Sequence, residues 1–147
     1  MTTDHYPDLT QNLGLALLAC SNAPALLLNR EMGVIGASES FYLAFPLKPE
    51  NVAGHCLFEL GAGEWDVPQL RSLMNATLGG YARIEAYEMD FGSGTPRRLV
   101  LNARKLDYGS ADQTLLLLTI TDVTEARISE KLKDDLLREK AILLQEI

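Results

Sequence analysis

The chain has 147 residues, of which 47% are apolar and 22% are charged, and its formal net charge is -7. This composition is typical of one soluble globular domain with a single hydrophobic core. No basic cluster occurs beyond Arg97-Arg98, and the simplest interpretation of this pair is a solvated strand edge. Because nucleic-acid binding requires Lys and Arg side chains to neutralise phosphates, we expect no nucleic-acid partner.

The sequence indicates neither a zinc site nor a membrane span. Cys20 and Cys56 lie far apart, and the two histidines are His5 and His55, so a structural zinc site is excluded. The longest apolar stretch, 13–28, is interrupted by polar residues and a proline and falls short of the ~20 apolar residues that a membrane helix needs. No positively charged signal-peptide region precedes it. We expect a cytoplasmic protein with no membrane partner.

The N-terminal part of the chain predicts an amphipathic helix over 9–21. Its apolar residues follow a helical spacing, and Pro24 ends it because proline lacks a backbone N–H. We expect this helix, assigned to residues 1–22, to lie outside the main core. The stripe consists of Leu9, Leu13, Ala16, Leu17 and Cys20.

The next segment predicts a hairpin and two helices. Two short apolar runs flank Asn29-Arg30-Glu31, which is typical of a β-hairpin. A short helix over 38–46 follows. The clearest internal helix spans 66–78, where Asp66 is the expected N-cap and Gly79-Gly80 the stop.

Three strands come next, within 81–91, 97–108 and 114–123, separated by two turns rich in Gly and Ser. In the first strand we expect Ile84, Ala86 and Tyr87–Met89 to share one side. Three consecutive antiparallel strands after a hairpin and small helices predict an α+β fold.

A long charged helix follows the last strand, from Glu125 to the end of the chain. Its leucines form a stripe that must be buried against another surface. Neither candidate seam is a clean heptad, so we expect a dimerising helix of modest strength. The stripe consists of Ile128, Leu132, Leu136 and Leu143.

The end of the last strand, "TDVTEAR" (121–127), resembles the closing motif of PAS domains. The resemblance covers about 23–124 and implies a five-stranded antiparallel sheet with small helices on one face, flanked by the two amphipathic helices. In physical terms, Asp122 and Thr124 would hold the strand to the helix, through a carboxylate paired with a base or N–H and a capping hydroxyl. We expect both residues to relay a signal from the sheet into the helix of 125–147.

Two further stretches resemble signalling proteins. Residues 58–78 and 99–106 are similar to PAS domains in front of histidine kinases and chemotaxis-type methyltransferases, and 136–147 resembles the segment before the phosphoacceptor histidine of HWE/HisKA-2 type kinases. The resemblance implies a sensor and dimerisation domain of a two-component histidine kinase that is not itself an enzyme. Its expected partners are a second copy and the kinase core. The expected dimer contacts are Leu9, Leu13, Leu17, Leu132, Leu136 and Leu143.

Three residues are candidates for lining an internal cavity for an unknown small molecule. Trp65 lies beside a helix start, but tryptophan is more often a packing anchor there. Asn102 lies between apolar strand residues and needs a polar partner if it is buried, although it can equally face solvent. Cys56 is a candidate reactive thiol, although a structural role is its default interpretation.

The same resemblance raises two candidate cofactors, flavin and haem. Flavin-binding PAS domains of the LOV type have an Asn and an Arg flanking the reactive Cys, where this chain has His55 and Leu57. Haem-binding members use a His on the long internal helix, and 66–78 contains none. We therefore expect no cofactor. The alternatives are a light or redox sensor with flavin or haem, and a ligand-free interaction module.

The purified protein should accordingly be colourless, because the positions that hold flavin phosphate or haem iron carry other residues. An absorption spectrum of the purified protein across the visible range checks this directly. A visible band from flavin or haem at close to one equivalent per chain would favour the cofactor-bearing alternative.

Overall fold

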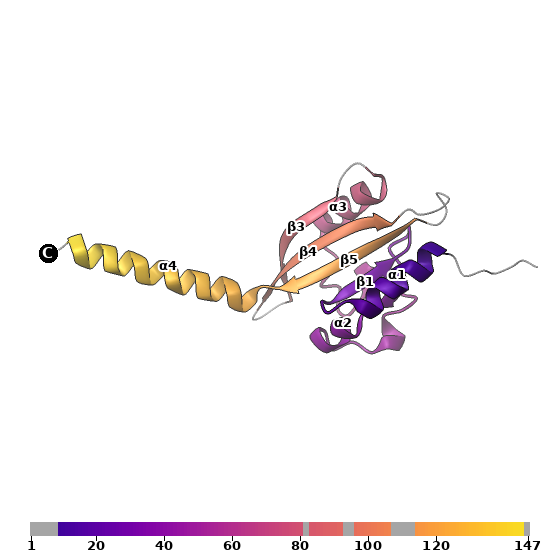
Figure 1. Cartoon of the computed structure of the whole chain (residues 1–147), viewed down its shortest axis with the longest axis horizontal. Helices are drawn as coiled ribbons and strands as arrows, with labels where there is room; N and C mark the ends of the chain where they lie inside the picture. Colours follow the sequence, from indigo (N-terminus) through magenta and orange to yellow (C-terminus); the bar gives the residue numbers. More distant parts are fainter. Residues whose placement is uncertain (1–8, 81–82, 93–95, 107–113, 146–147) are drawn as a thin grey trace, which may run out of the picture.

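The computed structural model describes residues 9–80, 83–92, 96–106 and 114–145 (Figure 1). The predicted α+β order is confirmed. The elements are α1 (Leu9–Cys20), β1 (Ala25–Leu28), β2 (Val34–Ala37), α2 (Glu39–Ala44), α3 (Pro68–Leu78), β3 (Ile84–Phe91), β4 (Arg97–Leu106), β5 (Leu115–Asp122) and α4 (Thr124–Gln145), with 3₁₀ turns η1 (Pro49–Asn51) and η2 (Leu57–Glu59). The strands form one sheet of order β2-β1-β5-β4-β3, and all neighbours are antiparallel.

Short polar side chains fix the turns around the first hairpin. The amide oxygen of Asn29 accepts hydrogen bonds from the N–H groups of Glu31 and Gly33 at 3.0 and 2.8 Å, so the side chain closes the turn that its position predicted. Ser38 caps α2 by accepting from the N–H of Phe41. The same hydroxyl oxygen also accepts from the N–H of Ala25 at 2.9 Å and thereby ties α2 to the start of β1.

The predicted N-cap of α3 is wrong by one residue. Val67 occupies the cap position and Pro68 the first helical position, which suits proline because its fixed φ and missing N–H are tolerated there. Asp66 instead pairs with Arg71, one turn into the helix, at 2.6 Å between Oδ1 and Nε.

The sheet buries side chains on both faces. On the inner face α2, the 3₁₀ turns and α3 cover the larger core, whose centre holds Trp65, Phe41, Leu70 and Met74. On the outer face α1 covers β1 and part of β5 (Figure 1) with a smaller cluster around Leu18. Because both faces of β1 are covered, all four of its residues are buried.

Helix α1 uses a different face from the predicted stripe to contact the sheet. Gly14 and Leu18 are buried, whereas Leu13 and Leu17 remain 48% and 46% exposed. A Cβ atom at Gly14 would lie 2.7 Å from Leu27 Cδ2, so any larger residue would require the Leu27 side chain to move. The leucine side of α1 is therefore left uncovered within one chain.

Strand β3 contains a bulge that the predicted alternation did not include. Ile84 pairs with Ala103 and Tyr87 with Leu101, so three steps along β3 match two along β4. Ala86, inside the bulge, has a φ of 52°, which is uncommon for a residue other than glycine. The expected one-sided grouping of Ile84, Ala86 and Tyr87–Met89 is therefore wrong, because one extra residue exchanges the two faces.

Helix α4 leaves the sheet at the end of β5 and projects away from the rest of the chain (Figure 1). Its side chains from Glu125 to Leu144 are all exposed. In the described part of the chain, no helix combines the length and the apolar character required to cross a bilayer. The exposed large apolar residues of α4 are Ile128, Leu132, Leu136, Leu137, Ile142, Leu143 and Leu144.

Candidate functional site: the strand-to-helix joint

Asp122, Val123 and Thr124 form the joint, a connection from β5 to α4 without an intervening loop. One carboxylate oxygen of Asp122 accepts hydrogen bonds from the N–H of Thr124 at 2.9 Å and from its hydroxyl group. The backbone also pairs across the joint, because the N–H of Val123 donates to the carbonyl oxygen of Arg98 at 2.9 Å. These bonds fix the first turn of α4 to the end of the sheet.

Arg97 connects the joint to the interior of the fold. Its Nε donates to the second carboxylate oxygen of Asp122 at 2.8 Å, and a terminal nitrogen donates to the carbonyl oxygen of Ala44 at 3.1 Å. Its guanidinium carbon lies 4.6 Å from the centre of the Phe45 ring, within the range of a cation–π contact. Phe45 in turn packs against Trp65. One side chain thus contacts the end of α2, the aromatic core and Asp122.

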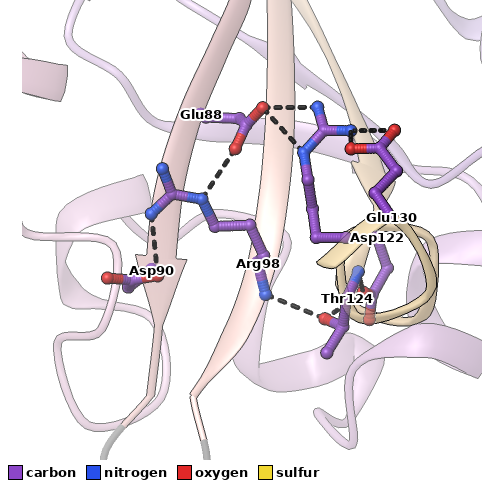
Figure 2. A network of polar contacts seen from close by, with 7 residues as sticks. Glu88, Asp90, Arg98, Asp122, Thr124 and Glu130 are labelled. Atoms are coloured by element: carbon purple, nitrogen blue, oxygen red, sulfur yellow. Dashed lines mark hydrogen bonds and ion pairs between the residues drawn. The ribbon is translucent and has the colours of Figure 1, made fainter. Parts of the chain in front are cut away.

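Arg98 connects the joint to the outer face (Figure 2). Its backbone N–H donates to the Thr124 hydroxyl oxygen at 2.8 Å, while its side chain pairs with Glu88 and Asp90 of β3 at 2.7 and 2.8 Å. Glu88 also receives the guanidinium of Arg127 from the first turns of α4. We call the ion pairs of Glu88 with Arg98 and Arg127 the outer clamp.

The charges of the site stabilise the ionised carboxylates. The hydrogen bonds from Arg127 and Arg98 lower the pKa of Glu88 from 4.5 to about 2. Burial raises the pKa of Asp122, but the hydrogen bonds from Thr124 and Arg97 outweigh it and leave the pKa below its ordinary value. Both groups are therefore anionic at neutral pH, as the joint and the outer clamp require.

Two of the three candidate cavity residues contact the larger core, and the third lies on the other face of the sheet. Trp65 is buried, 1% exposed, and packs against Phe45 and Phe91. Cys56 is half-buried at the start of η2 and contacts the larger core. Asn102 lies between Leu101 and Ala103, which belong to that core, so its side chain points to the other face. Its amide oxygen accepts a hydrogen bond from the N–H of Ala86 at 2.8 Å. The structure does not bring these three residues together.

The residues predicted to form a dimer interface lie on two separate helices. Leu13 and Leu17 are exposed on α1, and Leu132, Leu136 and Leu143 are exposed on α4. Leu9 begins α1, but its side chain lies outside the described residues. Leu13, Ala16, Leu17 and Cys20 line one shallow apolar groove on α1.

Four residues of the site were missed from sequence. The simplest interpretation of Arg97-Arg98 was a solvated strand edge, which is wrong because both contact the joint. Two consecutive strand residues point to opposite faces. The pair begins β4, the neighbour of the strand that ends at Asp122, so its position could have indicated basic partners on both faces of the sheet. Glu88 and Arg127 are 39 residues apart, and no local pattern links them.

Comparisons with known proteins give the fold a name. No protein-family model matches the sequence, and no curated protein matches it. Among solved structures, the chain is similar to the PAS domain of Bordetella pertussis BvgS, with 18% identity, a TM-score of 0.57, and coverage of 90% of this chain and 99% of that chain. It therefore has the PAS fold.

Two other similar structures come from different kinds of protein. One is the photoactive yellow protein domain from the sensor histidine kinase Ppr of Rhodospirillum centenum, with 15% identity, a TM-score of 0.58, and coverage of 76% of this chain and 96% of that one. The other is the LOV protein of Rhodobacter sphaeroides, with 14% identity, a TM-score of 0.60, and coverage of 79% and 68%. At these identities the likeness establishes the fold alone.

The outer clamp should be insensitive to pH near neutrality and should weaken in acid. A carboxyl whose pKa falls from 4.5 to about 2 on folding stabilises the fold fully above its unfolded pKa, and this contribution disappears as the pH falls towards 2. Urea unfolding of the wild type and Glu88→Gln measures it. The difference in unfolding free energy should be constant above pH ~5 and shrink as the pH falls. A difference that is the same at pH ~3 as at pH ~7 would contradict this linkage.

Proposed function

We propose that this chain is the cytoplasmic sensor and dimerisation domain of a two-component sensor histidine kinase, in which the joint passes a change in the sheet to α4. The observation that carries the proposal is the contrast between the two ends of α4. Its first residue is hydrogen-bonded to two strands through Asp122 and Arg98, whereas its side chains from Glu125 to Leu144 are exposed. The sheet therefore fixes the orientation of α4, while the exposed side chains of α4 remain free to contact a second copy or the kinase core.

A joint without a loop suits a relay for a mechanical reason. A flexible linker would absorb a displacement of β5, whereas a helix bonded at its first turn has to follow it. Arg97 contacts the interior aromatic cluster and Asp122, so a change in the interior has a short route to α4. An unknown small molecule is one agent of such a change, and the kinase core of the same protein is the proposed receiver.

Dimerisation follows from the uncovered apolar stripes of α1 and α4. The exposed fractions of Leu132, Leu136 and Leu143 are each about 60%, and burial of a large apolar side chain contributes ~1.5–3 kcal/mol when it is complete. A parallel homodimer would cover the α1 leucines and the α4 stripe with the same elements of a second copy, as a two-fold interface requires. It would also deliver two α4 helices side by side to a dimeric kinase core.

The isolated chain should therefore be a dimer at micromolar concentration. Multi-angle light scattering measures the mass, and replacing Leu132 and Leu136 with serine should shift the equilibrium towards the 16.2 kDa monomer. The control is Leu43→Ser on α2, which also removes an exposed leucine but lies outside the proposed interface. A wild-type monomer, or a dimer that is indifferent to the α4 substitutions and to Leu13→Ser and Leu17→Ser, would refute this interface.

The relay is tested at Asp122 in the full-length protein that carries this chain. Asp122→Ala removes the hydrogen bonds to Thr124 and Arg97 and should cost ~1–2 kcal/mol, well below a typical total of ~5–15 kcal/mol. We expect the circular dichroism spectrum to be unchanged. We expect autophosphorylation to stay fixed, either high or low, and no longer to respond to the signal that this domain senses.

A matched control for this experiment is Asp66→Ala. Asp66 is also an exposed aspartate paired with an arginine, but its pair lies at the start of α3, away from the joint. Regulation should survive this change. If Asp122→Ala leaves autophosphorylation as responsive as Asp66→Ala does, the joint is only a structural connection. A full-length protein without histidine autophosphorylation would refute the kinase assignment itself.

A further inference from the structure

The bulge in β3 decides which way Glu88 points. Side chains of a strand alternate between its faces, so one inserted residue exchanges the faces for the remainder of the strand. Ile84, before the bulge, is buried in the larger core, and so is Met89 after it. These residues are an odd number of positions apart, which an unbroken alternation forbids. Glu88 therefore lies on the outer face, where Arg98 and Arg127 bind it.

Without the bulge the outer clamp would not form. In a regular strand Glu88 would share a face with Ile84, four residues earlier, and that face is the apolar interior. An ionised carboxylate is excluded from such a position by its desolvation cost. The contact between β3 and α4 thus depends on the one extra residue between Ile84 and Tyr87, which lies a few positions before Glu88.

Asn102 holds this bulge in place. Its amide oxygen accepts a hydrogen bond from the backbone N–H of Ala86 at 2.8 Å. Ala86 is the bulge residue whose φ is 52°. Asn102 lies on β4, which is paired with β3 on one side and β5 on the other, so its position is well fixed. β3, in contrast, is an edge strand of the sheet and can change its register against a single neighbour.

We propose that Asn102 is a positioning residue of the joint: by fixing the β3 bulge it turns Glu88 onto Arg127 and so sets the direction in which α4 leaves the sheet. Two contacts then orient the helix, the joint at its first residue and the outer clamp about one turn later. The second contact prevents the rotation about Thr124 that the first alone would allow. The inference rests on the proposed function only for the meaning of that direction as a signal.

Pulsed electron paramagnetic resonance measures the direction of α4. Spin labels are attached to cysteines introduced at Glu50, on η1, and Arg138, on α4, after Cys20 and Cys56 are replaced by serine. Arg138 lies ~21 Å along the helix from Thr124, so a tilt of ~10° displaces it by ~4 Å. Dilution with excess unlabelled protein leaves one labelled chain per assembly. The distance is therefore measured within a chain whether or not the chain dimerises.

Asn102→Ala should shift the label distance or broaden its distribution at least as far as Glu88→Gln, which removes the outer clamp directly. Asn102→Asp, which retains the acceptor oxygen, should keep the wild-type distance. Ala86→Gly should keep it as well, because glycine adopts a positive φ without strain. Arg71→Gln, which removes an exposed ion pair elsewhere, controls for a general loss of surface charge pairs.

Three outcomes would overturn the proposal. The first is a wild-type distance in Asn102→Ala beside a displaced helix in Glu88→Gln, which would mean that the bulge does not need Asn102. The second is an undisplaced helix in both, which would mean that the clamp does not orient α4. The third is a displaced helix in Asn102→Asp equal to that in Asn102→Ala. Should Asn102→Ala not fold, Asn102→Gln moves the amide oxygen by one methylene and gives the same test.

Discussion

The bonds of one carboxylate hold the sheet and α4 together. Asp122 accepts from Thr124 with one oxygen and from Arg97 with the other, so it satisfies a donor at the start of a helix while it neutralises a strand arginine. Asp122 is the last residue of β5 and Thr124 the first of α4. A negative charge at a helix N-terminus is also favoured by the helix dipole. The short connection is therefore stable without a loop.

The two arginines at the start of β4 make this joint sensitive to both faces of the sheet. Because consecutive strand residues point in opposite directions, Arg97 reaches Phe45 and the interior, whereas Arg98 reaches Glu88 on the outer face. Both also contact the joint, Arg97 through its side chain and Arg98 through its backbone. The contacts of both arginines thus converge on the same three residues, as the proposed relay requires.

Local chemistry made most of the fold predictable, and non-local pairing accounts for what was missed. The hairpin at Asn29, the helix over α3 and the Asp122–Thr124 motif each depend on residues within a few positions of one another. The bulge at Ala86 does not, because it is held by Asn102, sixteen residues away. The buried face of α1 was misjudged for a similar reason. Gly14 carries no apolar side chain, yet it faces the sheet, because contact with Leu27 favours the smallest residue rather than the most apolar one.

That choice of face has a consequence for assembly. Helix α1 carries leucines on more than one face, so packing through Leu13 and Leu17 would have left Leu15 and Leu18 towards solvent. Packing through Gly14 and Leu18 instead leaves Leu13 and Leu17 in solvent. The same holds for the leucines of α4, which no element of the described chain covers. Exposed apolar patches of this kind are typical of interaction surfaces, and the leucines of α1 and α4 are the surface on which the proposed homodimer depends.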